Sequence, residues 1–236
     1  MRTSLRSRTT RRSKSSVAWF GLLREPEFFG VTTVNDPHKQ LEIVLAAAGK
    51  QLASAVERLG YPNGNRDAVI PENNILIHVA SELAGLGFAL YCEAALSDAD
   101  PDSPARRIDL IAANDELSIA FEFKRRARPE SVLADLQRLD EFVVRPSTRV
   151  DGSRSSAYSD ARQAIAAFVT TSYGVSEENW LALQNADADL PQNWSSVRDF
   201  VVDRKAVVSR TEAFWESDQH FAATGELRLA WIAFAK

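Results

Sequence analysis

The stretch that decides the fold runs from Arg106 to Arg128 and reads RRIDLIAANDELSIAFEFKRRAR. Its first half is apolar except for Asp109, and its second half alternates large apolar side chains with small or polar ones. A period of two is typical of β-strands, so each half is predicted to form one strand. Asn114 and Asp115 lie between the two runs, and both residue types favour tight turns. The stretch therefore predicts a β-hairpin with its turn centred on Asn114-Asp115.

A turn at this position would place Asp109 opposite Ala120 and make Glu122 its diagonal neighbour, about 7–8 Å away between backbones. Because successive side chains of a strand point to opposite faces, Lys124 lies on the same face as Glu122. Two carboxylates and one ammonium group would then gather at one end of the hairpin. Hard divalent cations prefer such oxygen ligands, and a nearby lysine can hold a phosphate or activate the attacking water.

The same residues have a structural interpretation, an amphipathic hairpin whose solvent face carries an ordinary ion pair. Glu-x-Lys is a common sequence, and charge on a solvated strand face is unremarkable. What favours a functional site is the position of Asp109, because an unpaired charge in an otherwise apolar strand would be costly. The apolar residues around Glu122 also indicate a central strand.

The hairpin resembles the PD-(D/E)XK nuclease superfamily, which has the restriction-endonuclease-like fold. In that superfamily an acid lies near the start of the second core strand, and Glu or Asp, any residue and Lys follow on the third. Asp109 matches the first position and Glu122-Phe123-Lys124 the second, with the usual separation of 13 residues (122 − 109). Ile108 stands where the motif name has proline. The resemblance implies Mg²⁺ or Mn²⁺ held by Asp109, Glu122 and the backbone carbonyl of Phe123, with Lys124 next to the attacking water.

Helical and strand patterns surround the hairpin. The sequence predicts helices over 36–59 and 73–86, a strand over 88–96, a helix from Pro129, a strand over 164–171 and a last strand over 227–234 at the sheet edge. Helix, strand, strand, strand, helix, strand is the order of the superfamily core, and that order helped to assign 164–171 as a strand. The prediction is one α/β domain over 17–236, with a mixed central sheet flanked by helices and a restriction-endonuclease-like core at about 72–172.

Many superfamily members have a further acid on the first core helix. Glu82, on the flank of the apolar stripe of the 73–86 helix, resembles that acid, although a solvated helix glutamate is an equal alternative. Glu93, near the end of the 88–96 strand, is a weaker candidate. In the helix that begins at Pro129, the apolar stripe directs Asp135 and Arg138 outward or sideways.

Arginines flank the hairpin on both sides. Arg107, Arg125, Arg126 and Arg128 form, together with Arg106, the strongest local basic cluster outside the N-terminus. Arginines grouped next to a metal site are suited to bind backbone phosphates. The alternative is a set of solvated arginines at the ends of strands.

The composition is that of a globular protein, with 236 residues, 45% hydrophobic and 25% charged. The formal net charge of −4 requires any contact with nucleic acid to come from a local patch. A single cysteine, Cys92, excludes an intrachain disulfide framework and fits a cytoplasmic setting. No run approaches the roughly 18 apolar residues of a membrane span, so no membrane contact is predicted.

Residues 1–16 contain six basic residues, many Ser and Thr, and no acid. Such a segment has little to bury and is predicted to be a flexible basic arm that contacts phosphates without sequence preference. An unstructured start without a role is an equal alternative, and a transit peptide is less favoured.

These features predict a metal-dependent nuclease that acts on DNA, or on RNA as an alternative substrate, in prokaryotic defence, restriction or repair. Cutting both strands of a duplex would need two copies of the single site, which favours a homodimer. The competing hypothesis is a non-catalytic binding or assembly protein that keeps the nuclease-like fold.

Overall fold

The computed structural model describes residues 36–59, 70–95, 107–144, 163–216 and 226–235. The predicted basic arm, Arg106 and the connecting segments 60–69, 96–105, 145–162 and 217–225 lie outside these residues. No helix within the described ranges has the length and apolar character needed to cross a membrane.

The elements are, in order, α1 (Pro37–Leu59), α2 (Glu72–Gly85), β1 (Ala89–Ala95), β2 (Arg107–Ala113), β3 (Leu117–Lys124), α3 (Pro129–Val144), β4 (Gln163–Thr170), α4 (Glu177–Ala182), the 3₁₀ helix η2 (Gln192–Trp194), α5 (Ser195–Asp203), β5 (Val207–Arg210), β6 (Trp215–Glu216), β7 (Glu226–Leu227) and β8 (Ala230–Ala235).

Six strands form an open mixed sheet in the order β1-β2-β3-β4-β8-β5. Only β3 and β4 pair in parallel, and α3 provides the crossover that a parallel pair requires. This confirms the prediction of an α/β fold with a mixed sheet, and the order from α2 to β4 is the predicted one. The prediction that the last strand lies at the sheet edge is wrong, because β8 pairs with both β4 and β5. A continuous apolar run such as 230–234 is typical of a strand buried on both faces.

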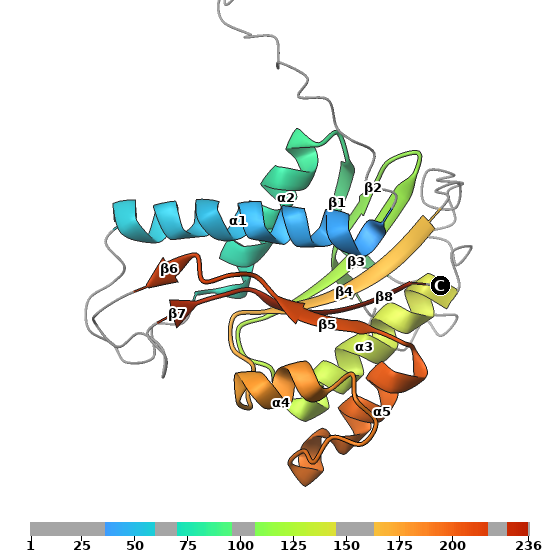
Figure 1. The fold of residues 1–236 in the computed structure, drawn as a ribbon. Coiled ribbons are helices and arrows are strands. Elements are labelled where there is room, and N and C mark those ends of the chain that lie inside the picture. Colours follow the sequence, from blue (N-terminus) through green and yellow to red (C-terminus); the bar gives the residue numbers. More distant parts are fainter. Residues whose placement is uncertain (1–35, 60–69, 96–106, 145–162, 217–225, 236) are drawn as a thin grey trace, which may run out of the picture. The chain divides into compact units, whose positions relative to one another are not determined.

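Helices cover both faces of this sheet (Figure 1). The buried residues of α1 and α2 share one hydrophobic cluster with one face of the strands, and those of α3, α4 and α5 share a second cluster with the other face. The two-sided cover explains why β3 is buried at every position except Lys124. Ser118 and Glu122, which are 1% and 0% exposed, therefore do not lie on a solvated strand face. The interpretation of the hairpin as a solvent-facing amphipathic one is wrong.

The hairpin between β2 and β3 has a different register from the predicted one. Ala120 pairs with Ile111 and not with Asp109, so the turn is centred on Asp115-Glu116. Asn114 occupies the first position of the turn, where its side-chain oxygen accepts the N–H groups of Glu116 at 3.0 Å and Leu117 at 2.8 Å. Such an Asx turn uses asparagine as an acceptor and needs no left-handed backbone. The shift amounts to two residues, which leaves every side chain on its predicted face.

The connection from β3 to α3 is held against the segment that follows β4. The N–H of Ala127 donates to the carbonyl of Ser172 at 2.9 Å. Gly174 follows with φ +70°, and a Cβ at this residue would lie 1.8 Å from the Ala127 carbonyl oxygen. Only glycine combines this backbone conformation with so close an approach. These contacts of Ala127 with Ser172 and Gly174 hold the connection that follows Lys124 in place.

Candidate functional site

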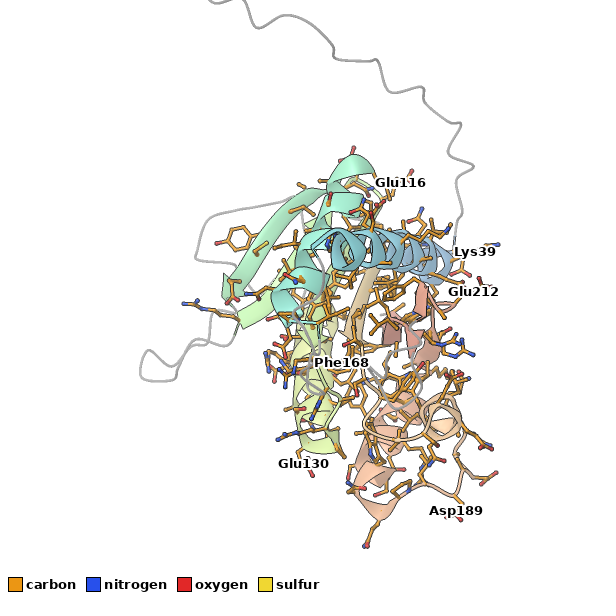
Figure 2. The ribbon with its side chains drawn as sticks, turned by 90° about the vertical axis from the view of Figure 1, so that its left-hand side faces the viewer. Lys39, Glu116, Glu130, Phe168, Asp189 and Glu212 are labelled. Atoms are coloured by element: carbon orange, nitrogen blue, oxygen red, sulfur yellow. The ribbon has the colours of Figure 1, made fainter. Side chains whose placement is uncertain are left out.

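The candidate site lies at the end of β3 that leads into α3. Figure 2 shows the two ends of this region, with Glu116 in the hairpin turn and Glu130 in the first turn of α3 far from each other. Phe168 of β4 lies between them and is the register partner of Glu122. The side chains of Glu122 and Lys124 face α3, which packs across β3 and β4.

Four charged side chains form a chain of alternating sign between β3 and α3. Arg138 donates from Nη1 to Glu122 Oε1 at 2.8 Å and from Nη2 to Asp135 Oδ1 at 2.6 Å. The other oxygen of Asp135 lies 3.3 Å from the ammonium nitrogen of Lys124. Asp135 is only 2% exposed, so the prediction that it faces outward or sideways is wrong. Helical periodicity assigned it to the polar flank, but buried charges on a neighbouring strand need partners.

Asp109 joins the site through the backbone of β3. The β2–β3 pairing ends at Leu110 and Phe121, and beyond it Asp109 Oδ2 accepts the N–H of Phe123 at 2.8 Å. The carboxylate thereby replaces the next ladder bond and lies beside Glu122. The structure therefore brings Asp109, Glu122 and Lys124 together at one end of the hairpin.

The pKa of Glu122 is strongly raised by its surroundings. Burial raises its pKa to about 9, the carboxylates of Asp109 and Asp135 add to the rise, and Arg138 and Lys124 oppose it. Its Oε2 atom is buried without a hydrogen-bond partner. Buried acceptors without a partner are rare in folded proteins because desolvation is not compensated. This oxygen is therefore suited either to carry a proton or to ligate a cation.

The pKa values of Lys124 and Asp135 are both shifted by their surroundings, and the shift at Lys124 favours the charged form of the lysine. Burial lowers the pKa of Lys124, but the carboxylates of Asp135, Asp109, Glu122 and Glu72 outweigh this and raise the pKa above its ordinary value. Burial raises the pKa of the Asp135 carboxyl, and Lys124 and Arg138 oppose that rise. A lysine held in its charged form is suited to bind an anion and unsuited to accept a proton.

Glu82 does not lie with these residues. Its carboxylate accepts a hydrogen bond from the side-chain amide of Gln51 in α1, and Val79 and Leu83 beside it pack into the cluster on the opposite face from α3. Topology explains this position. α2 ends shortly before β1, whose first residue pairs with Ala113 next to the hairpin turn. The later turns of α2 therefore lie near the turn and its N-terminus near the end of β3.

Glu72 is the acid of α2 that the sequence analysis missed. It is the first residue of the helix, its Oε1 accepts the N–H of Arg125 at 3.0 Å, and its charge contributes to the raised pKa of Lys124. The signal that could have identified it is the order of α2 and β1. An antiparallel strand that begins beside the hairpin turn requires the preceding helix to start at the other end of the sheet.

The predicted phosphate-binding arginines divide into two groups. Arg107 makes an ion pair with Glu93 at 3.6 Å, with both side chains largely exposed, and its carbonyl accepts a hydrogen bond from Arg138. Glu93 has φ 55° and is directed to Arg107. Arg125, Arg126 and Arg128 are exposed on the connection between β3 and α3. Within the described part of the chain, no carboxylate pairs with the side chains of Arg125 and Arg128.

The donor set suits a cation that binds few protein ligands. Across the described ranges, no group of three or more His, Cys, Asp and Glu side chains is placed to hold a metal ion. Mg²⁺ typically uses one or two carboxylates and completes its shell with water and substrate phosphate. The Asp109 carboxylate and the unpartnered Oε2 of Glu122 meet that smaller requirement.

No family model, curated protein or solved structure matches the chain. The arrangement of the chain's own residues is therefore the basis for its proposed function. The arrangement to be explained is a buried carboxylate oxygen without a partner, beside a second carboxylate and a charged lysine, at the end of two adjacent strands.

Proposed function

We propose that this protein is a divalent-metal-dependent nuclease that hydrolyses phosphodiester bonds, with DNA as its substrate. The observation that carries the proposal is the unpartnered Oε2 of Glu122, buried beside Asp109 and Lys124. The order helix, strand, strand, strand, helix, strand from α2 to β4 supports the resemblance to the PD-(D/E)XK superfamily. That resemblance favours a role in prokaryotic defence, restriction or repair.

Asp109 and Glu122 would hold Mg²⁺ or Mn²⁺, and the superfamily resemblance adds the backbone carbonyl of Phe123. When bound, such a cation acts as a Lewis acid on a phosphate oxygen. Glu122 gains most from it, because a cation offsets the burial and the neighbouring carboxylates that raise its pKa. The hydrogen bond from Phe123 N–H holds one oxygen of the Asp109 carboxylate in place next to the backbone of β3.

Lys124 would act on the substrate as a charged donor. Its ammonium group can donate to the attacking water and to the nonbridging oxygens, whose negative charge grows in the transition state. Arg125 and Arg128 would bind phosphates on either side of the reacting one, since both are exposed directly after Lys124. This local group of cations provides the attraction that a net charge of −4 does not.

The proposal is tested by incubating supercoiled plasmid and single-stranded DNA with the protein in Mg²⁺, Mn²⁺ or EDTA. Asp109→Ala removes a metal ligand and Lys124→Ala removes the charged donor, so each is expected to slow cleavage by about 100-fold or more. Asp140→Asn is the matched control, because it removes a carboxylate of α3 that pairs at 2.7 Å with Arg204, away from the site.

Metal-dependent cutting that is lost in both site variants and kept in the control would support the nuclease and its site. Cutting that survives both substitutions would place the activity elsewhere or in a contaminant. The same assay with labelled RNA separates the two substrates, because an RNA-specific enzyme would leave DNA intact.

Removing Arg125 and Arg128 should weaken DNA binding in a salt-dependent way. Each phosphate contact contributes about −0.9 to the slope of log affinity against log salt concentration on duplex DNA. Arg125→Ala combined with Arg128→Ala is therefore expected to make the slope less steep by about 2. Fluorescence anisotropy over a salt series with catalytically inactive Asp109→Ala protein measures it. An unchanged slope would show that these arginines do not contact phosphate.

A non-catalytic binding or assembly protein is the second candidate. It is favoured by the network itself, in which Arg138 already supplies a cation to Glu122 and Lys124 to Asp135. Calorimetry discriminates the two functions. A nuclease should bind Mg²⁺ or Mn²⁺ through Asp109 and Glu122, whereas no binding even with DNA present would count against catalysis.

A further inference from the structure

We propose that Asp135 is a positioning residue that holds both charged side chains of β3 in place for the reaction. It acts on Lys124 directly and on Glu122 through Arg138. This inference rests on the proposed function, but its first test does not require catalysis. No sequence motif pointed to it, and only the packing of α3 on β3 brings these residues together.

Asp135 uses one oxygen for each of two cations. Oδ1 accepts from Arg138 Nη2 at 2.6 Å, and Oδ2 lies 3.3 Å from Lys124 Nζ. Among the described residues it is the only carboxylate within ion-pair distance of the Lys124 ammonium group. Arg138 in turn donates to Glu122 at 2.8 Å and to the carbonyl of Arg107 at 3.1 Å. One carboxylate therefore connects the lysine and the buried glutamate of β3 with the start of β2.

The helix face beneath Asp135 is tightly packed. Its own side chain is 2% exposed, and the neighbouring Val132, Leu136 and Leu139 of α3 are all fully buried against the sheet. Asp135 and Arg138 are three residues apart, so they share one helix face and meet without a change in the backbone. Groups that act on a reacting atom need their rotamers fixed by packing and by outer hydrogen bonds. A lysine with four rotatable side-chain bonds gains most from such an anchor.

A purely structural ion network would make a different prediction. Its loss would lower the stability of the whole protein without a selective effect on Lys124. A positioning role predicts that Lys124 becomes mobile and accessible while the rest of the chain is unchanged. Lys39 and Lys50 of α1 are both exposed and serve as internal references in the same molecule.

The first experiment measures the acetylation rate of individual lysines by acetic anhydride, with mass spectrometry as the detector. In Asp135→Asn protein we expect Lys124 to react several-fold faster than in the wild type, whereas Lys39 and Lys50 keep their rates. Asp140→Asn, which breaks the ion pair between α3 and Arg204, should leave Lys124 unchanged. Because Lys39 and Lys50 are already exposed, circular dichroism under the labelling conditions checks the fold of the Asp135→Asn protein. Loss of the folded-state signal would overturn the inference, as would an unchanged rate at Lys124.

The second experiment measures DNA cleavage by the same variants. Outer residues that orient a catalytic group typically contribute about 10- to 100-fold to activity, so Asp135→Asn is expected to lower kcat by that factor. The KM for DNA should stay constant, because Arg125 and Arg128 are untouched. A folded Asp135→Asn protein with wild-type kcat would overturn the inference. If Lys124 labelling changes as expected but no form of the protein cuts nucleic acid, the proposed function fails while the anchoring of Lys124 stands.

Arg138→Lys provides a second variant that keeps the charge of the network. A lysine cannot bridge Glu122, Asp135 and the Arg107 carbonyl in the planar arrangement of a guanidinium group. We expect kcat to fall while Lys124 labelling stays at the wild-type rate, because Asp135 still holds Lys124. Full activity in this variant would exclude the part of the inference that runs through Arg138.

Discussion

Replacing Glu122 with glutamine is expected to abolish metal-dependent cleavage while making the metal-free protein more stable at pH 8. The carboxylate is a proposed metal ligand, so its loss should lower the cleavage rate by about 100- to 1,000-fold. Glutamine has nearly the same shape and no charge to desolvate. Because burial and the neighbouring carboxylates disfavour the ionised form of Glu122, the neutral side chain removes an unfavourable contribution to folding.

The direction of the pH dependence follows from the pKa of Glu122. In the unfolded chain this pKa is near 4.5, whereas in the folded protein burial raises it to about 9. Between these values the folded protein keeps a proton that the unfolded chain has released, so the contribution of this residue to stability falls as the pH rises. The advantage of Glu122→Gln should be small near pH 4.5. It should grow to on the order of a few kcal/mol by pH 9.

Thermal unfolding with and without Mg²⁺ measures both effects. Ligands that bind only the folded state raise the melting temperature, so Mg²⁺ should stabilise the wild type and leave Glu122→Gln unaffected. Metal binding should also release a proton in the wild type at neutral pH, because the ligand has to be ionised. If the variant proved less stable than the wild type at pH 8 without metal, Glu122 would be a favourable structural charge. That result would support the non-catalytic candidate.

Gly174→Ala is expected to destabilise the fold by about 3 kcal/mol. The left-handed backbone costs a residue with a Cβ about 1–2 kcal/mol, and forcing extra volume into a packed site costs about 1–3 kcal/mol. Here φ is +70° and the added carbon would lie 1.8 Å from the carbonyl oxygen of Ala127, so the backbone has to move. For a protein of this size the melting temperature should fall by about 10 °C.

Gly85→Ala is the matched control for this substitution. Gly85 is the last residue of α2, and a Cβ there would meet nothing within 4 Å. Alanine should therefore stabilise the helix by about 0.5–1 kcal/mol. Denaturant unfolding of the two variants compares them directly. Equal effects at both positions would show that the close approach of Gly174 to Ala127 does not constrain the fold.

Gly174→Ala should also affect the site. The Ala127 carbonyl belongs to the connection that carries Arg125 and Arg128, and the N–H of Ala127 is bonded to Ser172. Displacing this connection moves the exposed arginines relative to Lys124. A weaker binding of DNA at temperatures well below unfolding would accompany the loss of stability.

The local pattern of the sequence was sufficient for the elements from α1 to β4 and for the central group of residues. Alternation in 117–123 predicted β3, and the apolar stripes predicted α1, α2 and α3 within a residue or two of their observed bounds. Strand parity placed Glu122 and Lys124 on one face whatever the register, and Asp109 stayed on that face because the error in register was an even number of residues. Side-chain period is a local property of the backbone, so it can be read without knowing what packs against it.

The hairpin register and the position of β8 needed more than this pattern. Asn114 accepts two backbone N–H groups in the first position of the turn, and a sequence with Asn and Asp side by side does not distinguish this from a turn centred on Asn114 itself. Similarly, the run 230–234 is compatible with an edge or a central strand. Its place between β4 and β5 depends on β5, a four-residue strand too short to leave a clear pattern.

By itself, the sequence determined the order of the elements from α1 to β4 and the trio of Asp109, Glu122 and Lys124. Only the tertiary structure decided what surrounds them. In the structure Glu122 is buried, and Asp135 and Arg138 face the sheet. The acid of α2 that lies near Lys124 is Glu72 and not Glu82. Electrostatic partners are chosen by packing between elements distant in the chain, and periodicity within one element cannot show which charged flank another element will cover.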